Sequence, residues 1–174
     1  MSGNIIKSDQ ILLRRTQAED LDFVLDTEAV EDSRRYVFTW PKEKHEFAMN
    51  NDDQLHIIIE NMAGEKLGYI ILAGLRNEHH CIELTRINMA SKNKGYGKEA
   101  ISLIQNYVFH KLQAHRLWLD VKEDNARARH VYESAGFTME GTLRECIHTN
   151  GVYESLVIMG MLASEYKQRQ MLER

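Results

Sequence analysis

The segment best suited to chemistry is a loop rich in lysine and glycine, which reads SKNKGYGK over residues 91–98. Gly95 and Gly97 stand where a helical pattern begins, and glycine lets the backbone approach a ligand closely. Unpaired N–H groups at a helix start and the positive end of the helix dipole favour an anion, and three lysines add positive charge. The loop therefore predicts a pyrophosphate site, although a flexible solvated turn can have the same composition.

Two known phosphate-binding patterns can be compared with this loop. A P-loop requires Ser or Thr after its Gly-Lys pair, whereas Lys98 is followed by glutamate. The dinucleotide fingerprint G-x-G-x-x-A does match residues 95–100, and Asp120 ends the next predicted strand. The fingerprint turn follows its strand at once, however, whereas five residues separate Met89 from Gly95. A nicotinamide-binding Rossmann oxidoreductase therefore stays an alternative, and a P-loop does not.

A second motif, NARARHVYESAGF, spans residues 125–137. On a helix, Asn125, Arg129 and Tyr132 lie at spacings of four and three, so they share one face and can be presented to a ligand together. A purely structural interpretation is also open: Asn125 caps the helix start, Tyr132 is a half-buried aromatic and Gly136 caps the helix end.

A carboxylate interrupts the otherwise apolar pattern of the strand CIELTRINM, residues 81–89. Strict alternation places Glu83 on one face together with Ile87 and Met89. A carboxylate in a well-covered strand needs a partner, so Glu83 is either half of a cross-strand ion pair or a general base.

Metal and cysteine chemistry are not expected. His79, His80 and Cys81 are consecutive, and neighbours along a strand point to opposite faces, so they make a poor set of metal ligands. The only two cysteines, Cys81 and Cys146, are too few for a disulfide framework. Each falls on a predicted strand, where we expect a buried free thiol.

Composition limits the class of protein. The chain has 174 residues, of which 43% are hydrophobic and 28% are charged, and these values are typical of a single globular domain. The net charge of −4 gives no reason to expect nucleic acid as a partner. The longest apolar runs are far shorter than a membrane helix, and the start MSGNIIKSDQ has no signal-peptide core. We expect a cytoplasmic protein of one domain, residues 1–174, with its core over about 11–162 and a polar tail over 163–174. From Ser164 on, this tail is expected to be a frayed helix or an irregular end.

The elements that must position these motifs alternate between strands and helices. Thr16 to Glu19 has the spacing of a capping box that starts a helix, and Asn150-Gly151 is a strong hairpin signal. We predict an α/β fold with a mixed sheet and helices on its faces. The predicted strands are 11–15, 55–61, 66–75, 81–89, 116–121, 137–145 and 152–162, and the later helices are 42–50, 97–110 and 125–135.

The two motifs together resemble those of the GNAT acetyltransferase superfamily. Its acetyl-CoA loop reads Q/R-x-x-G-x-G/A, which residues 92–97 match with Lys92 at the first position. Its later helix reads N-x-x-A-x-x-x-Y-x-x-x-G-F, which residues 125–137 match in full. The resemblance extends over about Ile11 to Met161, and the C-terminal third is similar to the branch of ribosomal-protein N-terminal and spermidine or diamine acetyltransferases.

The resemblance implies a mostly antiparallel sheet in which a central pair of parallel strands splays apart to admit acetyl-CoA. No metal is implied. The backbone near the end of the first splayed strand would contact the pantetheine arm, and the loop amides would hold the pyrophosphate. The implied cofactor-binding residues are Ile87, Met89, Lys92, Lys94, Gly95, Tyr96, Gly97, Lys98, Asn125 and Arg129.

The implied reaction is direct attack of a primary amine on acetyl-CoA, with a polyamine, a diamine or a protein N-terminus as the acceptor. Tyr132 would protonate the departing thiolate, and Glu83 would accept the proton of the amine. Glu28, Glu31 and Asp32, which otherwise look like a solvated helix end, would border the acceptor groove. A non-catalytic acyl-CoA-binding module is a further alternative, and a homodimer is left open.

Overall fold

The computed structural model describes residues 3–92 and 94–174, apart from the side chains of Glu31 and Asp32. Its centre is an eight-stranded sheet in the order β1-β2-β3-β4-β5-β6-β8-β7. The strands are β1 (Asn4–Lys7), β2 (Ile11–Arg15), β3 (Gln54–Asn61), β4 (Lys66–Ala73), β5 (Cys81–Met89), β6 (Arg116–Lys122), β7 (Thr138–Thr149) and β8 (Val152–Leu162). The α-helices are α1 (Leu21–Ala29), α2 (Glu31–Tyr36), α3 (Lys42–Asn50), α4 (Tyr96–Asn106), α5 (Ala126–Ser134) and α6 (Ala163–Leu172).

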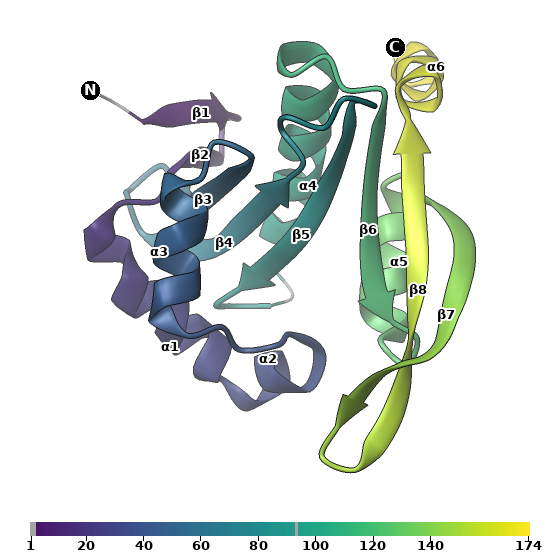
Figure 1. Cartoon of the computed structure of the whole chain (residues 1–174). Coiled ribbons are helices and arrows are strands. Elements are labelled where there is room, and N and C mark those ends of the chain that lie inside the picture. The colour runs from purple at the N-terminus through teal and green to yellow at the C-terminus, as the bar shows by residue number, and fades with distance from the viewer. Residues whose placement is uncertain (1–2, 93) are drawn as a thin grey trace.

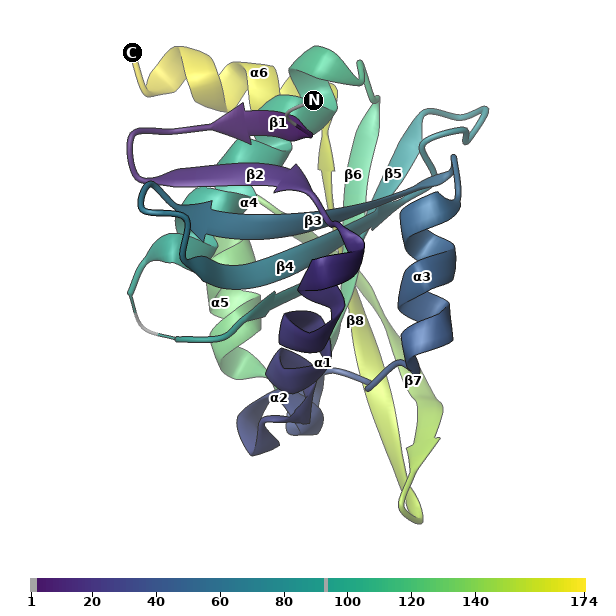
Figure 2. The same ribbon diagram turned by 90° about the vertical axis from the view of Figure 1, so that its left-hand side faces the viewer.

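Helices cover both faces of the sheet (Figures 1 and 2). Helices α1, α2 and α3 lie on one face, where Val24 of α1 packs against Ile58, Tyr69 and Ile71 of β3 and β4. Helices α4 and α5 lie on the other face, over the larger apolar core. That core contains Ile57, Ile70, Leu84, Ile101, Ile104, Leu117, Leu119 and Met159 among its buried members. The apolar residues of α4 therefore form the predicted inward stripe.

Strands β5 and β6 are parallel neighbours, and they pair only over a short stretch. The ladder runs from Cys81 opposite Arg116 to Glu83 opposite Trp118, and beyond it the two strands diverge (Figure 1). The other neighbouring strands pair antiparallel. The predicted mixed sheet with a splayed parallel pair is confirmed, and the Rossmann alternative is wrong because it requires a parallel sheet.

A β-bulge in β5 corrects the predicted side-chain alternation. Ile71 of β4 pairs with Arg86, but the next residue, Leu72, pairs with Leu84, so Thr85 is an extra residue in β5. The bulge switches the faces: Ile82 and Leu84 before it, and Ile87 and Met89 after it, all pack on the α4 side. Glu83 therefore does not share a face with Ile87 and Met89, as strict alternation had predicted. It lies on the α1–α3 face, as Arg86 does.

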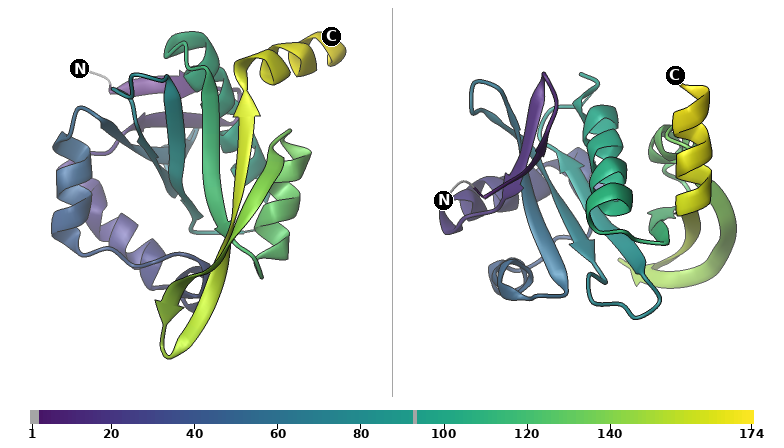
Figure 3. Two further views of the ribbon diagram at one scale, coloured as in Figure 1. Left: turned by 45° about the vertical axis from the view of Figure 1, so that its right-hand side comes forward. Right: turned by 90° about the horizontal axis from the view of Figure 1, so that it is seen from above.

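The last two strands form the predicted hairpin, which projects from the body of the molecule (Figure 3). Asn150 and Gly151 at its tip have φ angles of 52° and 79°, as a tight hairpin turn requires. After β8 the chain continues into α6, where a polar tail was predicted. Tyr166 of α6 is 4% exposed and stacks on Phe109 with ring centroids 4.9 Å apart, so α6 is anchored to the core.

The capping box predicted at Thr16 is shifted by one residue. Gln17 precedes a 3-10 turn (Ala18–Asp20), and the Gln17 N–H donates to Asp20 Oδ2 at 2.7 Å. Thr16 is not the cap because its hydroxyl is buried against His56 Nδ1 at 2.7 Å. Glu19 is exposed and takes no part in the box. Among the residues described, no helix is long and apolar enough to span a membrane.

Candidate active site

The glycine-rich loop connects the end of β5 to the start of α4. Gly95 has a φ of 80°, a left-handed conformation that favours glycine, and it is the N-cap of α4. The N–H groups of Tyr96, Gly97 and Lys98 fall in the first turn of α4, where no helical carbonyl is available to accept from them. The structure therefore places a set of backbone donors and the positive end of the α4 dipole at this loop.

The lysines of the loop add positive charge to these donors. Lys92, Lys94 and Lys98 are exposed, so their ammonium groups can reach an anion in solvent. Asn93, which belongs to the predicted loop, lies outside the described residues. The predicted pyrophosphate site is thus brought together locally, but contact of Lys92 with an anion stays a prediction.

Substitution of Gly97 by valine is expected to raise the KM for acetyl-CoA at least about tenfold, because the branched side chain would occupy the space that a bound pyrophosphate needs. A Cβ at Gly97 would meet Met89 Cγ at 3.6 Å, an ordinary contact, so the folded protein has space for the first atom of the new side chain. Gly141→Val on β7 is a matched control, since no described atom lies within 4 Å of a Cβ there. An unchanged KM in a Gly97→Val enzyme of normal thermal stability would refute the role of the loop.

The edge of β5 beside β6 offers backbone groups to an extended ligand. Beyond Glu83, β5 has no ladder partner in β6, so backbone N–H and C=O groups on that edge are available for hydrogen bonding. Ile87 and Met89 lie on this stretch and pack on the α4 side of the sheet. The free edge of β5 thus runs from Glu83 toward the loop that leads into α4.

Helix α5 brings the second motif to the same face of the sheet as α4. Asn125 is the N-cap, and its Oδ1 accepts the Ala128 N–H at 3.1 Å, as the structural interpretation predicted. Arg129 is half-buried and donates to the Glu123 carbonyl at 3.0 Å. Both side chains therefore have structural partners, and their contact with acetyl-CoA stays a prediction.

Tyr132 lies in the last turn of α5 and packs against the core on the α4 side of the sheet. Its ring is half-buried and packs edge to face on Phe137, with centroids 5.9 Å apart. Burial, and then the negative charge of Asp120, raise the pKa of Tyr132 to about 12. The raised pKa keeps the phenol protonated at neutral pH.

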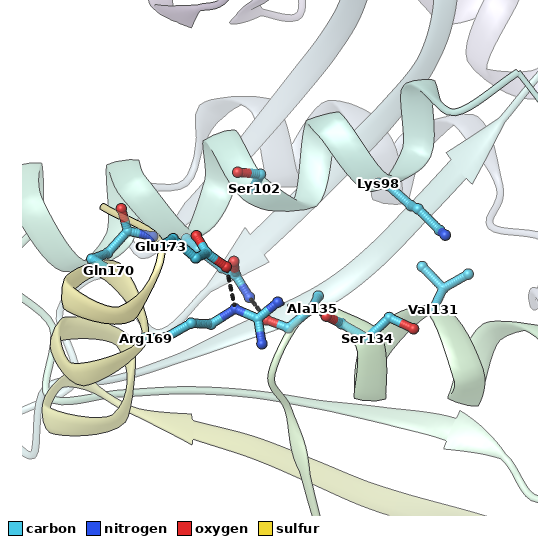
Figure 4. A pocket seen from close by; sticks show the side chains of 9 residues that line it. Lys98, Ser102, Val131, Ser134, Ala135, Arg169, Gln170 and Glu173 are labelled. Carbon is cyan, nitrogen blue, oxygen red and sulfur yellow. Dashed lines mark hydrogen bonds and ion pairs between the residues drawn. The ribbon is translucent and has the colours of Figure 1, made fainter.

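A pocket of about 170 Å³ lies between α4, α5 and α6 (Figure 4). Lys98 and Ser102 line it from α4, and Val131 and Ser134 line it from α5. Arg169 enters from α6, where it pairs with Glu173 at 3.2 Å and donates to the Ser134 carbonyl at 2.7 Å. Helix α6, where the sequence left a frayed helix or a tail open, thus forms one wall of this pocket beside the glycine loop.

Two carboxylates face each other where β5 and β6 separate. Glu83 is opposite Trp118 in the ladder, and Asp120 is two residues further along β6 on the same face as Trp118. Burial, and then the negative charge of Asp120, raise the pKa of Glu83, and burial also raises the pKa of Asp120. No ion pair of Glu83 is found within the described part of the chain, so its charge is not neutralised by a neighbouring Lys or Arg side chain. The alternative of a cross-strand ion pair is therefore not supported.

Asp120 is a site residue that the sequence reasoning missed. It was considered only as the acidic residue of a dinucleotide fingerprint. Predicting that β6 pairs parallel with β5 could have identified Asp120, because that pairing puts Asp120 beside Glu83.

Glu28 is buried, not solvated as predicted for a helix end. It is 2% exposed, and its Oε1 accepts from Arg86 at 2.6 Å and from the Tyr69 hydroxyl at 2.5 Å. Its Oε2 accepts the Trp40 N–H at 3.0 Å. Because both oxygens are occupied, Glu28 has little capacity to contact an acceptor directly. The side chains of Glu31 and Asp32 lie outside the described part of the structure, so their predicted role stays a prediction.

The two cysteines differ from each other in burial. Cys81 is half-buried, whereas Cys146 is exposed on β7, so the expectation of a buried thiol is wrong for Cys146. Among the described residues, no group of three or more His, Cys, Asp or Glu side chains is arranged to hold a metal ion.

A parallel strand pair that diverges after a short ladder, followed by a helix start capped by a left-handed glycine, is the arrangement that the sequence resemblance implied. Residues 10–138 match the acetyltransferase (GNAT) domain family, so the chain belongs to that family. It is an N-acetyltransferase whose acetyl donor is acetyl-CoA.

The most informative relatives act on polyamines. The spermidine N(1)-acetyltransferases of Vibrio cholerae and Escherichia coli K12 are 26% and 27% identical to this chain. The matches cover 93% and 90% of this chain, and 98% and 88% of the relatives. A crystal structure of the Vibrio cholerae spermidine N-acetyltransferase in complex with CoA and spermine superposes with a TM-score of 0.83 at 25% identity. That match covers 92% of this chain and 99% of the other.

Proposed function

We propose that the protein acetylates a primary amine of a polyamine or diamine, and that Glu83 and Asp120 receive this amine at the splay. The observation that carries the proposal is the pair of carboxylates at the point where β5 and β6 separate, of which Glu83 is half-buried and Asp120 is exposed. Alkyl ammonium groups are cations at neutral pH, so two carboxylates in this position would attract and orient one. The relatives named for spermidine support the same substrate class.

The residues of the site have distinct roles in this proposal. The first turn of α4 binds the pyrophosphate, and the free edge of β5 binds the pantetheine arm, so that the thioester is held between the two strands. Glu83 accepts the proton of the bound ammonium, directly or through water, and the neutral amine attacks the thioester carbonyl. The C–S bond then breaks, and Tyr132 donates a hydrogen bond or its proton to the departing thiolate. No covalent acyl-enzyme is required.

Measurements of cofactor binding and of amine turnover distinguish this proposal from the alternative functions. Acetyl-CoA at 100 times its Kd should add about 2.7 kcal/mol to the free energy of unfolding, whereas NAD should not raise the Tm. Spermidine, a short diamine, free amino acids and a peptide with a free N-terminus are then compared by kcat/KM. The proposal expects the polyamine and the diamine to be the best substrates. A preference for the peptide would contradict it, and acetyl-CoA binding without turnover of any amine would favour a non-catalytic acyl-CoA-binding module. A cytoplasmic location and a homodimer stay predictions.

A further inference from the structure

The side chain of Trp118 lies on the α1–α3 face of β6. Leu117 and Leu119 on either side of it belong to the core under α4, so Trp118 points to the opposite face of the sheet. The side chain is half-buried. A large aromatic that stays partly exposed keeps part of its ring available for a ligand, and the proposed chemistry does not use this one.

Strand pairing places the Trp118 ring beside Glu83. The two residues are partners in the short parallel ladder, and neighbouring strands lie about 4.8 Å apart. Glu83 is on the same face as Trp118, because Ile82 and Leu84 on either side of it pack on the α4 side. The ladder ends at this pair. The indole is therefore next to the proposed base at the point where β5 and β6 separate.

Asp120 lies on the same face, further along β6. It comes two residues after Trp118, a step of about 6.6 Å along a strand, and its side chain is exposed. The ring thus has one carboxylate across the splay and another along its own strand. Negative charge at these two positions attracts a cation to the neighbourhood of the ring.

A cation of the chain itself already lies over the Trp118 ring. The Arg116 guanidinium is 5.8 Å from the ring centroid, within the range of a cation–π contact. Arg116 comes two residues before Trp118, so it approaches from the end of β6 opposite to Asp120. The ring therefore accepts positive charge on this face of the sheet.

Arg116 is held in this position by Glu140 of β7, its ion-pair partner. Gly160 of β8, which is paired with Trp118, gives the Glu140 carboxylate its place. A Cβ at Gly160 would lie 2.6 Å from Glu140 Oε1, so the missing side chain leaves space for this carboxylate. The Arg116 charge is thus already paired with Glu140, which leaves Glu83 without this cation.

We propose that the indole of Trp118 binds the ammonium group of the acceptor through a cation–π contact, on the side of the ring away from Arg116, and holds it beside Glu83. The proposal rests on the proposed function, because it places the reacting amine at Glu83. It assigns Trp118 as an acceptor-binding residue and defines the ligand chemically as a primary alkylammonium ion.

The contact affects binding more than the chemical step. The nitrogen is cationic when the acceptor arrives, and it becomes cationic again when it forms its bond to the thioester carbonyl carbon. The ring therefore stabilises the bound acceptor and the transition state to a similar extent. Loss of such a contact raises KM with little change in kcat.

The other tryptophan of the chain, Trp40, has a different environment. Arg86 and Lys44 lie over its ring, at 4.6 Å and 4.0 Å from the centroid, so this ring already binds cations of the chain itself. Replacement of Trp40 by phenylalanine retains an aromatic ring at this place and leaves Trp118 as the only tryptophan. The emission of Trp40→Phe protein thus reports on Trp118 alone.

Tryptophan emission provides a test that needs no turnover. CoA replaces acetyl-CoA, so the cofactor site is filled and no acetyl group can be transferred. We expect spermidine and a linear diamine to change the emission of Trp40→Phe protein in a saturable way. The uncharged diol of the same chain length should cause no change. An equal response to the diol would show a merely apolar contact and would overturn the proposal.

Kinetics provide the second measurement. In Trp118→Leu, the KM for spermidine should rise about tenfold, whereas kcat and the KM for acetyl-CoA should change less than about twofold. Trp118→Phe keeps an aromatic face and should recover part of the affinity. Tyr153→Leu on β8 is the control, because Tyr153 is an exposed aromatic that stacks on His148 near the hairpin tip.

The outcomes distinguish this proposal from the proposed function. An unchanged KM for spermidine in folded Trp118→Leu, or an emission that responds to neither amine, would overturn the role of Trp118. A lower Tm with equal losses for the amine and for acetyl-CoA would show that the ring is purely structural. If Trp118→Leu does not fold, Trp118→Phe and the emission titration decide. If the wild-type enzyme acetylates no polyamine, the proposed function fails, while the emission titration still decides whether the ring binds an alkylammonium ion.

Discussion

Replacement of Tyr132 by phenylalanine is expected to lower kcat about 10²-fold while leaving the affinity for acetyl-CoA nearly unchanged. A positioned general acid contributes roughly 10² to 10⁴ in rate. The lower value is expected here because the pKa of Tyr132 is raised to about 12, against about 8.5 for a thiol. Full proton transfer across that gap would cost about 5 kcal/mol, so Tyr132 acts mainly by hydrogen bonding to the developing thiolate.

The pH dependence of kcat checks the same assignment. Because burial keeps the phenol protonated until the pH approaches about 12, kcat of the wild-type enzyme should show no falling limb from Tyr132 between pH 7 and about 10. Tyr107→Phe is a matched control, since Tyr107 is also half-buried but lies at the far end of α4. A kcat within about threefold of wild type in Tyr132→Phe would show that Tyr132 contributes to packing and not to catalysis.

Replacement of Glu83 by glutamine is expected to lower kcat/KM for the amine at least about tenfold near pH 7. An alkyl amine with a pKa of ~10.4 costs about 4.6 kcal/mol to neutralise at pH 7, whereas a peptide α-amine near ~7.8 costs about 1 kcal/mol. An enzyme acting on polyamines therefore depends on its base more heavily than one acting on peptide N-termini. The loss in Glu83→Gln should accordingly be larger with spermidine than with a peptide.

The raised pKa of the Glu83 carboxyl determines how activity changes with pH. Because burial and the charge of Asp120 raise its pKa, the wild-type enzyme should lose activity as the pH falls through that raised value. In Glu83→Gln, activity should recover as the pH rises toward the pKa of the free amine, since the acceptor then loses its proton to water. Glu60→Gln on β3, which removes an ion-pair partner of Arg14, is the matched control. An equal loss at every pH would indicate a structural role for Glu83.

Local sequence was sufficient for the elements whose signals lie within a few residues. The Asn150-Gly151 turn, the left-handed Gly136 after α5 and the Asn125 cap of α5 each depend on the backbone preference of one or two residues. The strand Cys81–Met89 and the helix Lys42–Asn50 have the predicted bounds for the same reason. The loop and the helix motif to which acetyl-CoA binding is assigned were therefore predictable from spacing, and their contacts with acetyl-CoA stay predictions.

The acceptor side was decided by tertiary structure, because its residues come together from strands and helices far apart in the chain. One inserted residue, Thr85, reverses the side-chain alternation of β5, and a pattern of period two cannot reveal such a bulge. Parallel pairing of β5 with β6 places Asp120 beside Glu83, although 36 residues separate them in the sequence. Packing of α1 and α3 on one face buries Glu28 against Arg86, and a residue that looks solvated in the sequence thereby becomes part of the core.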